Sequence, residues 1–313
     1  MCARAQNLSQ AGLLYGPFAA QLPNGALFDF SSPSLKYDFG YPTAGYEMPY
    51  NVAQFTLIYN AEVVGATPPA SMLELIAWIK AHPRKFAYPV PSEDTAFESA
   101  ALLRHFFGAL CPPYSSFFGA FDEAKYRACT NGTSPSFWDQ LNDLQTYLWV
   151  NSTTGHPPKA GEMDDLFGSG QLAFTFSYDP FKAATAVAKG TWNASTTRSY
   201  VFTAGNLIGT IANTNFVAIP KNAPNLAAAL VAANAIASPA QMFARAHADV
   251  WGTFPAYTPG RVSEGWEAAF EEIEAVRSIN TPQFDMLAPH ALGELDAAYG
   301  ARLEADWARF VAH

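Results

Sequence analysis

The chain has 313 residues, of which 50% are hydrophobic and 14% aromatic, and its formal net charge is −9. This length provides an ample core for two lobes or for one large α/β domain, and the low charged fraction argues against disorder. The net negative charge argues against nucleic-acid binding, which requires basic surfaces. No apolar run is long enough to insert into a membrane.

In the first half of the chain, short strands alternate with helices. Residues 40–51 are rich in Gly, Pro and Tyr and predict irregular backbone, and a buried strand is predicted at 55–59. Ser71 and Glu74 form a capping box that opens a helix, which His82-Pro83 ends. A strand at 86–89, a Pro/acidic loop and a helix at 96–110 follow.

The second half continues this alternation. Ser134-Pro135 predicts the start of a helix, residues 151–159 a polar connector, and 172–176 a strand that ends at Ser177-Tyr-Asp-Pro180. A last helix carries an apolar stripe made of Leu292, Leu295, Tyr299, Leu303 and Trp307. The pattern as a whole predicts an α/β fold with mostly parallel strand pairing.

Residues 213–241 are the most informative stretch. The apolar run Phe216-Val-Ala-Ile219 predicts a buried strand, and Pro220 ends it by removing an N–H donor. A helix of small residues follows, and Ser238-Pro239 with Gln241 caps the next one. This order of elements resembles the segment of two-lobed binding proteins in which the chain returns through a hinge to its first lobe.

Several blocks of the chain together carry a family resemblance. They are Leu13-Leu-Tyr-Gly-Pro-Phe18, Leu22-Pro-Asn24, Tyr37-Asp-Phe-Gly40, Gly45-Tyr-Glu-Met-Pro-Tyr50, Phe86-Ala-Tyr-Pro89, Gly209-Thr-Ile-Ala-Asn213, Val217-Ala-Ile-Pro220 and Trp251-Gly252. In this order the chain resembles the family-1 extracellular solute-binding proteins, and within them the YnjB-like group. Each block is weak alone, whereas their joint order is specific.

The chain departs from that family in two respects. The resemblance begins only after the family's opening strand–helix–strand units, on the order of a hundred residues, so we expect a first lobe that is incomplete at its N-terminus. The loop after Pro89 also reads Val90-Pro-Ser-Glu-Asp-Thr-Ala96, without the glycine of the family's binding turn. A backbone without this glycine is expected to approach a ligand less closely.

The resemblance implies an α/β fold of the type-II periplasmic-binding-protein kind, with two lobes joined by hinge strands. Lobe one would hold residues 1–57 plus 213–313, and lobe two residues 58–212. Closure about the hinges would sequester a small-molecule ligand between the lobes. Thiamine or another cationic heterocycle is the first candidate, with no cofactor, no metal and no chemistry on the ligand implied.

The resemblance also implies a periplasmic or extracellular location and docking on an ABC permease. The first residues, Met-Cys-Ala-Arg-Ala-Gln-Asn, carry no apolar signal core, so either a leader lies outside this chain or the protein is not exported. Cys111 and Cys129 flank a Pro/Gly-rich stretch and are either a disulfide, which would stabilise the fold by roughly 3 kcal/mol, or two ordinary thiols.

The first candidate site residues precede the first hinge. Tyr46, Glu47 and Tyr50 would offer two aromatic faces and a carboxylate to a cationic ring, each face contributing roughly 0.5–2 kcal/mol. The alternative is that both tyrosines pack the hinge and Glu47 bonds backbone. Asn51 suits amide contacts and a turn equally well.

The other candidates follow strands or lie near the second hinge. Tyr178 and Asp179 end a strand, where open α/β sheets receive ligands, although Asp179 also suits a turn cap. Thr210 and Asn213 offer donors, or else mark a tight bend. Trp251 suits either a stacking platform or the core.

Three other functions compete with solute binding. A thiaminase-type enzyme shares this architecture, but neither Cys111 nor Cys129 lies in a nucleophile turn. A ferric-ion carrier would use paired tyrosines such as Tyr46, Tyr50 and Tyr178, while the histidines form no ligand-spaced cluster. An incomplete first lobe also leaves room for a non-transport interaction protein, in which an uncovered sheet edge recruits a partner.

Overall fold

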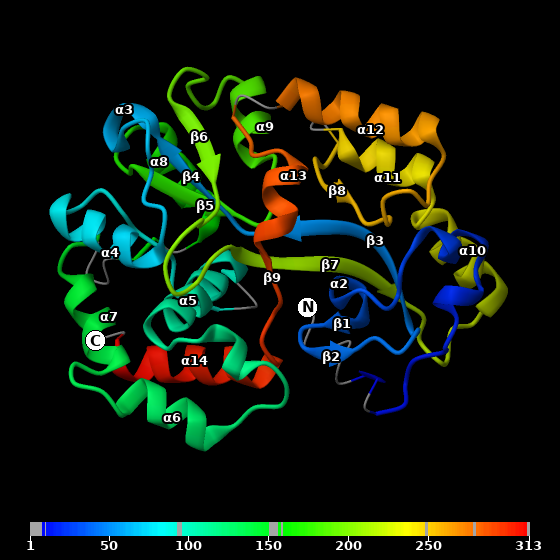
Figure 1. The fold of residues 1–313 in the computed structure, drawn as a ribbon, viewed down its shortest axis with the longest axis horizontal. Helices are drawn as coiled ribbons and strands as arrows, with labels where there is room; N and C mark the ends of the chain where they lie inside the picture. The colour runs from blue at the N-terminus through cyan, green and yellow to red at the C-terminus, as the bar shows by residue number, and fades with distance from the viewer. Residues whose placement is uncertain are drawn as a thin grey trace.

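The computed structural model describes residues 8–9, 11–92, 96–149, 156–157, 159–247, 250–277 and 280–311. Two long strands, β3 (Glu47–Gln54) and β7 (Thr210–Ala218), run side by side through the middle of the molecule, with helices on both sides (Figure 1). They are antiparallel because β3 carries the chain from one half into the other and β7 carries it back. The strand β7 overlaps the second predicted hinge segment, Asn213–Pro220, whereas β3 ends just before the first, Phe55–Tyr59.

One half of the molecule is built on a three-stranded antiparallel sheet. Its order is β5 (Phe174–Ser177), β4 (Thr56–Asn60), β6 (Thr197–Tyr200). The helices of this half are α3 (Ala61–Val64), α4 (Met72–Ala81), α5 (Phe97–Leu110), α6 (Glu123–Asn131), α7 (Phe137–Gln145), α8 (Ala160–Gly168) and α9 (Lys182–Ala188), with the 3₁₀ turn η3 (Tyr114–Phe117). The buried β4 is the strand predicted at 55–59.

The other half is built on a four-stranded sheet of order β8 (Phe254–Pro255), β3, β7, β9 (Ala291–Leu292). Its remaining elements are η1 (Ala19–Gln21), η2 (Pro23–Leu27), α2 (Pro33–Lys36), the hairpin β1 (Tyr37–Asp38) and β2 (Tyr41–Pro42), α10 (Leu226–Ile236), α11 (Pro239–Ala246), α12 (Glu264–Arg277), α13 (Phe284–Leu287) and η4 (Ala288–His290). The chain ends in α14 (Ala297–Phe310).

Several helix starts follow from their capping residues. Ser71 Oγ accepts from Glu74 N at 3.2 Å while Glu74 Oε2 accepts from Ala70 N at 2.9 Å, which confirms the predicted cap of α4. Ser238 Oγ accepts from Gln241 N at 3.3 Å, with Pro239 as the first helical residue of α11. The helix predicted from Ser134 begins at Phe137 instead, because Ser136 makes the complete capping box.

Three predictions about strands are wrong. Residues 47–51 are not irregular backbone but the first part of β3. Pairing is not mostly parallel, since of the described strand pairs only β7 with β9 is parallel. Residues 86–89 form no strand, although Phe86 to Tyr88 are buried. Their carbonyls have separate partners instead of one ladder: Trp149 N on Phe86, the His156 ring on Tyr88, and Ser99 Oγ on Pro89.

Among the described residues, two large hydrophobic cores are accompanied by two small clusters. The larger lies around the three-stranded sheet and includes Phe55, Phe107 and Phe174, and the smaller lies around η1, α10, α11 and α12 and includes Phe18, Met48 and Met242. The C-terminal helix α14 packs into the larger core through Tyr299, Leu303 and Trp307. We therefore propose the predicted lobe division at residues 57 and 213, but with residues 295–311 belonging to lobe two.

The start of β7 is held by two close contacts. The His105 ring of α5 accepts from Ile211 N at 3.0 Å through Nε2 and so donates from Nδ1 to Ala101 O at 2.7 Å; burial lowers the pKa of His105 to about 3. Gly209 has φ +100°, and a Cβ there would lie 2.2 Å from His290 O. Only glycine fits this bend, which leads the chain into the crossing strand.

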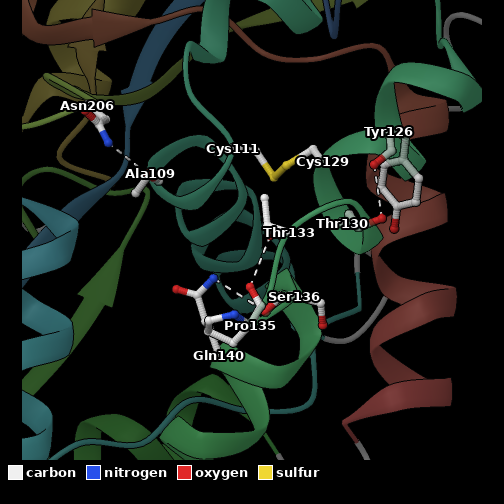
Figure 2. The surroundings of a disulfide bond; sticks show 10 residues. All are labelled: Ala109, Cys111, Tyr126, Cys129, Thr130, Thr133, Pro135, Ser136, Gln140 and Asn206. Atoms are coloured by element: carbon white, nitrogen blue, oxygen red, sulfur yellow. Dashed lines mark hydrogen bonds between the residues drawn. A yellow bond between two sulfur atoms is a disulfide. The ribbon is translucent and has the colours of Figure 1, made fainter.

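Cys111 and Cys129 form a disulfide that joins the end of α5 to α6 (Figure 2). Their Cα atoms lie 5.6 Å apart, and 18 positions separate them in the sequence. Of the two expected states of these cysteines, the structure therefore has the bonded one.

No single helix among the described residues has the length and apolar composition needed to cross a membrane. The pair α10 and α11 reaches that composition only together, and the two helices are bent by 56° at their junction.

Candidate functional site

A cavity of about 210 Å³ lies where the two halves of the molecule meet. It is lined by Phe39, Ala53, Phe97, Tyr178, Asp179, Asn213, Thr214, Asn215, Trp251 and Thr253. These residues come from the crossing strands β3 and β7, from the first residue of α5, from the turn after β5, and from segments next to β1 and β8. Both lobes thus contribute walls, and the crossing strands contribute the floor.

Four aromatic side chains give the cavity its apolar faces. Phe97 and Tyr178 contact each other with ring centroids 4.8 Å apart, and Tyr178 packs edge-on against Phe55 at 5.7 Å. Trp251 is 45% exposed and lies 6.4 Å from Tyr50, centroid to centroid. Phe39 has φ 45°, a left-handed backbone that is strained for a bulky residue and typical of functional sites.

Glu294, which lies behind the cavity lining, holds polar side chains of the cavity in place. Its Oε1 accepts from Tyr178 OH at 3.1 Å and from Asn213 Nδ2 at 3.0 Å, and its Oε2 lies 3.3 Å from Arg104 Nε. The Arg104 and Glu294 side chains are only 3% and 4% exposed, so this is a buried ion pair. It fixes the orientation of two cavity residues, Tyr178 and Asn213.

The Tyr178 hydroxyl is locked in its protonated form. Burial, and then the negative charge of Glu294, raise the pKa of Tyr178 well above its ordinary value. The neighbouring Asp179 caps the turn after β5, because its Oδ1 accepts from Phe181 N at 2.9 Å, and it lines the cavity as well. Both functions considered for Asp179 from its sequence position are therefore compatible.

A second acidic group lies at the start of β3. Glu47, 3% exposed, shares a hydrogen bond with the Asp38 carboxyl group of β1. Burial first, and then the charge of Glu47, raise the pKa of Asp38 to about 8, and burial also raises the pKa of Glu47. At neutral pH the pair therefore holds a proton on Asp38 and keeps one negative charge, and Glu294 adds a second negative charge nearby.

Replacing Asp38 by asparagine is expected to flatten the pH dependence of stability. Since the folded pKa, about 8, lies above the ordinary 3.8, Asp38 stabilises the fold fully below pH 3.8, and this contribution is lost as the pH rises through about 8. The melting temperature of the unaltered chain should therefore fall from about pH 4 to pH 8, and that of Asp38→Asn should fall less.

Asp139→Asn is the control with the opposite sign. Hydrogen bonds from Ser136 lower the pKa of Asp139, so its contribution to stability is present above the ordinary carboxyl pKa and is lost on acidification. Melting curves of Asp38→Asn and of the unaltered chain that ran parallel over pH 4–9 would contradict the buried proton on Asp38.

The structure brings four of the nine predicted site residues into the cavity lining, namely Tyr178, Asp179, Asn213 and Trp251. The other five lie elsewhere. Tyr46 packs over Gly16, and Glu47 pairs with Asp38. Thr210 Oγ1 is fully buried and accepts from Gln54 Nε2 at 3.3 Å.

Tyr50 and Asn51 both hold Arg245. Asn51 Oδ1 accepts from Arg245 Nε at 3.0 Å, and the guanidinium lies 5.2 Å from the centroid of the Tyr50 ring. Among the described contacts these two residues therefore anchor α11 to β3. Their placement beside the hinge in the sequence agrees with the structure, whereas their expected contact with a ligand stays a prediction.

The residues that sequence reasoning missed are those that position the others, above all Arg104 and Glu294. Arg104 and His105 interrupt the apolar run Leu102-Leu-Arg-His-Phe-Phe107 of a buried helix, and the charge of Arg104 in such a place needs a partner. That signal was available in the sequence. Nothing in the sequence links Arg104 to Glu294, which lies far along the chain.

A larger groove of about 690 Å³ runs between α9 on one side and α11 and α12 on the other. Its walls are mostly aliphatic and include Val187, Ile273 and the exposed Val276. It has one phenyl ring, Phe243, and one buried hydroxyl, Thr185, whereas the smaller cavity brings four aromatic side chains together with the buried Tyr178 hydroxyl and its ordered carboxylate, so the smaller cavity is the candidate site.

The alternatives to solute binding find little support in this geometry. Both cysteines considered as nucleophiles are joined in a disulfide. The three tyrosines considered as iron ligands do not converge, since of these only Tyr178 lines the cavity. Within the part of the chain that the structure describes, no group of three or more His, Cys, Asp or Glu side chains is placed to hold a metal ion.

Comparison with known sequences gives a consistent result. The family described as bacterial extracellular solute-binding protein matches residues 3–270. Over 240 residues the chain is 32% identical to Protein YnjB of Escherichia coli strain K12, which covers 77% of this chain and 56% of YnjB. The chain thus spans little more than half the length of this relative.

Solved structures agree on the fold. An ABC transporter structure from Clostridium perfringens matches 98% of this chain and 80% of its own, with a TM-score of 0.64 and 15% identity. A periplasmic thiamin binding protein matches 99% and 76%, with a TM-score of 0.61 and 14% identity. The spermidine/putrescine-binding protein PotD of Streptococcus pneumoniae matches 97% and 79%, at 0.60 and 13%. All three share the two-lobed α/β fold.

Proposed function

The chain belongs to the bacterial extracellular solute-binding proteins, a family of binding proteins and not of enzymes, and we propose that it captures a small cationic heterocycle in the cavity between its lobes. Thiamine is the first candidate. Structures similar to this chain carry names that mention thiamin in one case and spermidine and putrescine in another, all of which are cations. The ligand would be bound reversibly and released unchanged.

The observation that carries this proposal is the meeting of aromatic faces and carboxylates at the boundary between the lobes. Phe97, Tyr178 and Trp251 offer ring faces, and a cation over such a face gains roughly 0.5–2 kcal/mol, more as water is excluded. Asp179 adds a carboxylate at the wall. The walls come from both lobes, so a bound ligand would hold the lobes together.

The charge around the cavity also favours a cation. Arg104 and Glu294 compensate each other, and the Asp38–Glu47 pair keeps one net negative charge when it shares a proton. Together with Asp179 this leaves a negative surplus among the groups described at the site. An anionic ligand would meet that surplus without a compensating donor cluster.

The size of the cavity favours a ligand of about one or two rings. Its volume of about 210 Å³ is below the roughly 300–1,000 Å³ that is usual for drug-sized ligands. Long oligosaccharides would extend well beyond it.

We further propose that the protein works outside the cytoplasm and delivers its ligand to an ABC permease. The family is extracellular, and a disulfide such as Cys111–Cys129 persists in oxidising compartments. Because the members of this family are binding proteins, a separate permease would perform transport.

A thermal melt with ligand tests the proposal, and Trp251→Ala tests the site. Thiamine at a hundredfold excess over its dissociation constant adds about 2.7 kcal/mol and should raise the melting temperature by several degrees. Trp251→Ala should weaken binding by about 5- to 30-fold, because a cation–π face is lost. Isothermal titration of both proteins measures this change.

Phe118→Ala is the matched control, since Phe118 is 49% exposed, close to the 45% of Trp251, and lies outside the cavity lining. Its affinity should equal that of the unaltered chain. A melt that no cation shifts, or a Trp251→Ala variant that binds as tightly as the Phe118→Ala variant, would count against the proposed site.

A further inference from the structure

The floor of the cavity is a row of three residues across neighbouring strands. Ala53 of β3 pairs with Asn213 of β7, and the register of β3 with β8 pairs Val52 with Phe254, which sets Thr253 beside Ala53 on the other side. Cross-strand neighbours point to the same face, and all three line the cavity. With strands spaced by about 4.8 Å, Asn213 and Thr253 lie roughly 10 Å apart, with only the methyl group of Ala53 between them.

The amide of Asn213 is oriented by the buried carboxylate behind it. Its Nδ2 donates to Glu294 Oε1 at 3.0 Å, and a carboxylate can only accept, so the amide cannot be turned the other way. Its oxygen Oδ1 is thereby directed away from Glu294, and this atom is buried without a hydrogen-bond partner among the described residues. Asn213 therefore presents its Oδ1 acceptor on the side away from Glu294.

Thr253 carries the second such group. The side chain is only 4% exposed, and its Oγ1 is buried with no hydrogen-bond partner in the part of the chain described. A buried hydroxyl that lacks a partner destabilises the protein, and such groups are rare in folded proteins. Two of them at the two ends of one cavity floor indicate that a ligand completes their hydrogen bonds.

We propose that Asn213 and Thr253 read N–H donors at the two sides of the ligand, so that the site selects amines and amino-substituted rings over their N-methylated or carbonyl analogues. Asn213 Oδ1 and the Asp179 carboxylate can only accept, so each pairs with an N–H group, while the Thr253 hydroxyl accepts from an N–H group but is also able to donate. A ligand with a carbonyl oxygen in that place would leave Asn213 Oδ1 unpaired and facing another acceptor. This inference rests on the proposed function and narrows its ligand class.

Paired probes and one isosteric variant test this selection. The probes are thiamine against oxythiamine, in which an oxo group replaces the ring amine, and putrescine against its fully N-methylated bis-quaternary analogue. Thr253→Val keeps the shape and removes the hydroxyl. Of thiamine and putrescine, the probe that binds the unaltered chain more tightly is expected to bind Thr253→Val about tenfold more weakly than the unaltered chain. The melting temperature of this variant without ligand should stay equal or rise, since an unpaired buried hydroxyl is gone.

Thr281→Val is the matched control. Thr281 is also 4% exposed, its hydroxyl is likewise without a partner among the described residues, and it lies outside the cavity lining. It should share any gain in melting temperature but keep full affinity. Asn213→Leu supplies a second, independent loss of the acceptor.

The outcomes separate this inference from the proposed function. If no probe shifts the melting temperature of the unaltered chain, the proposed function fails and the inference fails with it. If the N–H probe binds and its methylated or oxo analogue binds as tightly, or if Thr253→Val binds as tightly as Thr281→Val, the cavity is still the site but the selection for N–H donors is wrong. The inference is supported if discrimination against the methylated analogue, about tenfold, disappears in Thr253→Val and discrimination against the oxo analogue disappears in Asn213→Leu.

Discussion

Replacing Glu294 by alanine is expected to lower the free energy of unfolding by about 3–5 kcal/mol, because it leaves the charge of Arg104 buried without its carboxylate. The two side chains are 3% and 4% exposed, so water cannot take the place of the lost partner. Two further hydrogen bonds, from Tyr178 and Asn213, also end on Glu294. Urea unfolding of both proteins measures the difference.

Two comparisons identify the cause of that loss. In the double variant Arg104→Met with Glu294→Gln, no charge remains buried and an acceptor is kept for Tyr178 and Asn213, so most of the stability should return. Asp143→Ala removes one partner of the exposed Lys80–Asp143 pair and should cost only about 0–1 kcal/mol. A Glu294→Ala variant as stable as Asp143→Ala would show that the buried pair has little role in folding.

Reducing the disulfide between Cys111 and Cys129 should destabilise the protein by about 3 kcal/mol. The reason is the conformational entropy of the unfolded chain, since the bond closes a loop across 18 positions. The bond ties the end of α5, the helix that carries Arg104 and His105, to α6 (Figure 2). Unfolding in urea, with and without a reductant, gives the size of the effect.

The variant Cys111→Ala with Cys129→Ala is the control for the reductant itself. It should be less stable than the oxidised chain by a similar amount and should not respond to the reductant at all. Equal unfolding midpoints for the oxidised chain and for this variant would contradict the entropic contribution of the bond.

Local signals in the sequence predicted the helices well. The caps at Ser71 and Ser238 depend on residues three positions apart, so they can be read from the chain directly. The prediction of a strand at 86–89 was wrong because no local signal showed where its backbone partners lie. Its apolar residues are buried as predicted, but their backbone partners come from distant positions such as Trp149 and His156.

The same contrast between local signals and distant contacts explains why only part of the candidate site could be predicted from the sequence. Tyr178 and Asp179 follow a strand and Asn213 lies in a hinge strand, so their positions in the sequence pointed to the cavity. Arg104 and Glu294 act through a contact between residues far apart in the chain, which no local pattern contains. Tyr50 and Asn51 have suitable chemistry, but Arg245 occupies them.

The C-terminal helix changes how the two lobes can move. The chain passes between the two cores three times: through β3 into β4, through β6 into β7, and through β9 into α14, which packs on α5 and α7. The first two connections run side by side as the antiparallel strand pair β3 and β7. The third connection, β9, pairs with β7, so all three connections lie in one sheet, and bending of that sheet about a single axis would open and shut the lobes along one path.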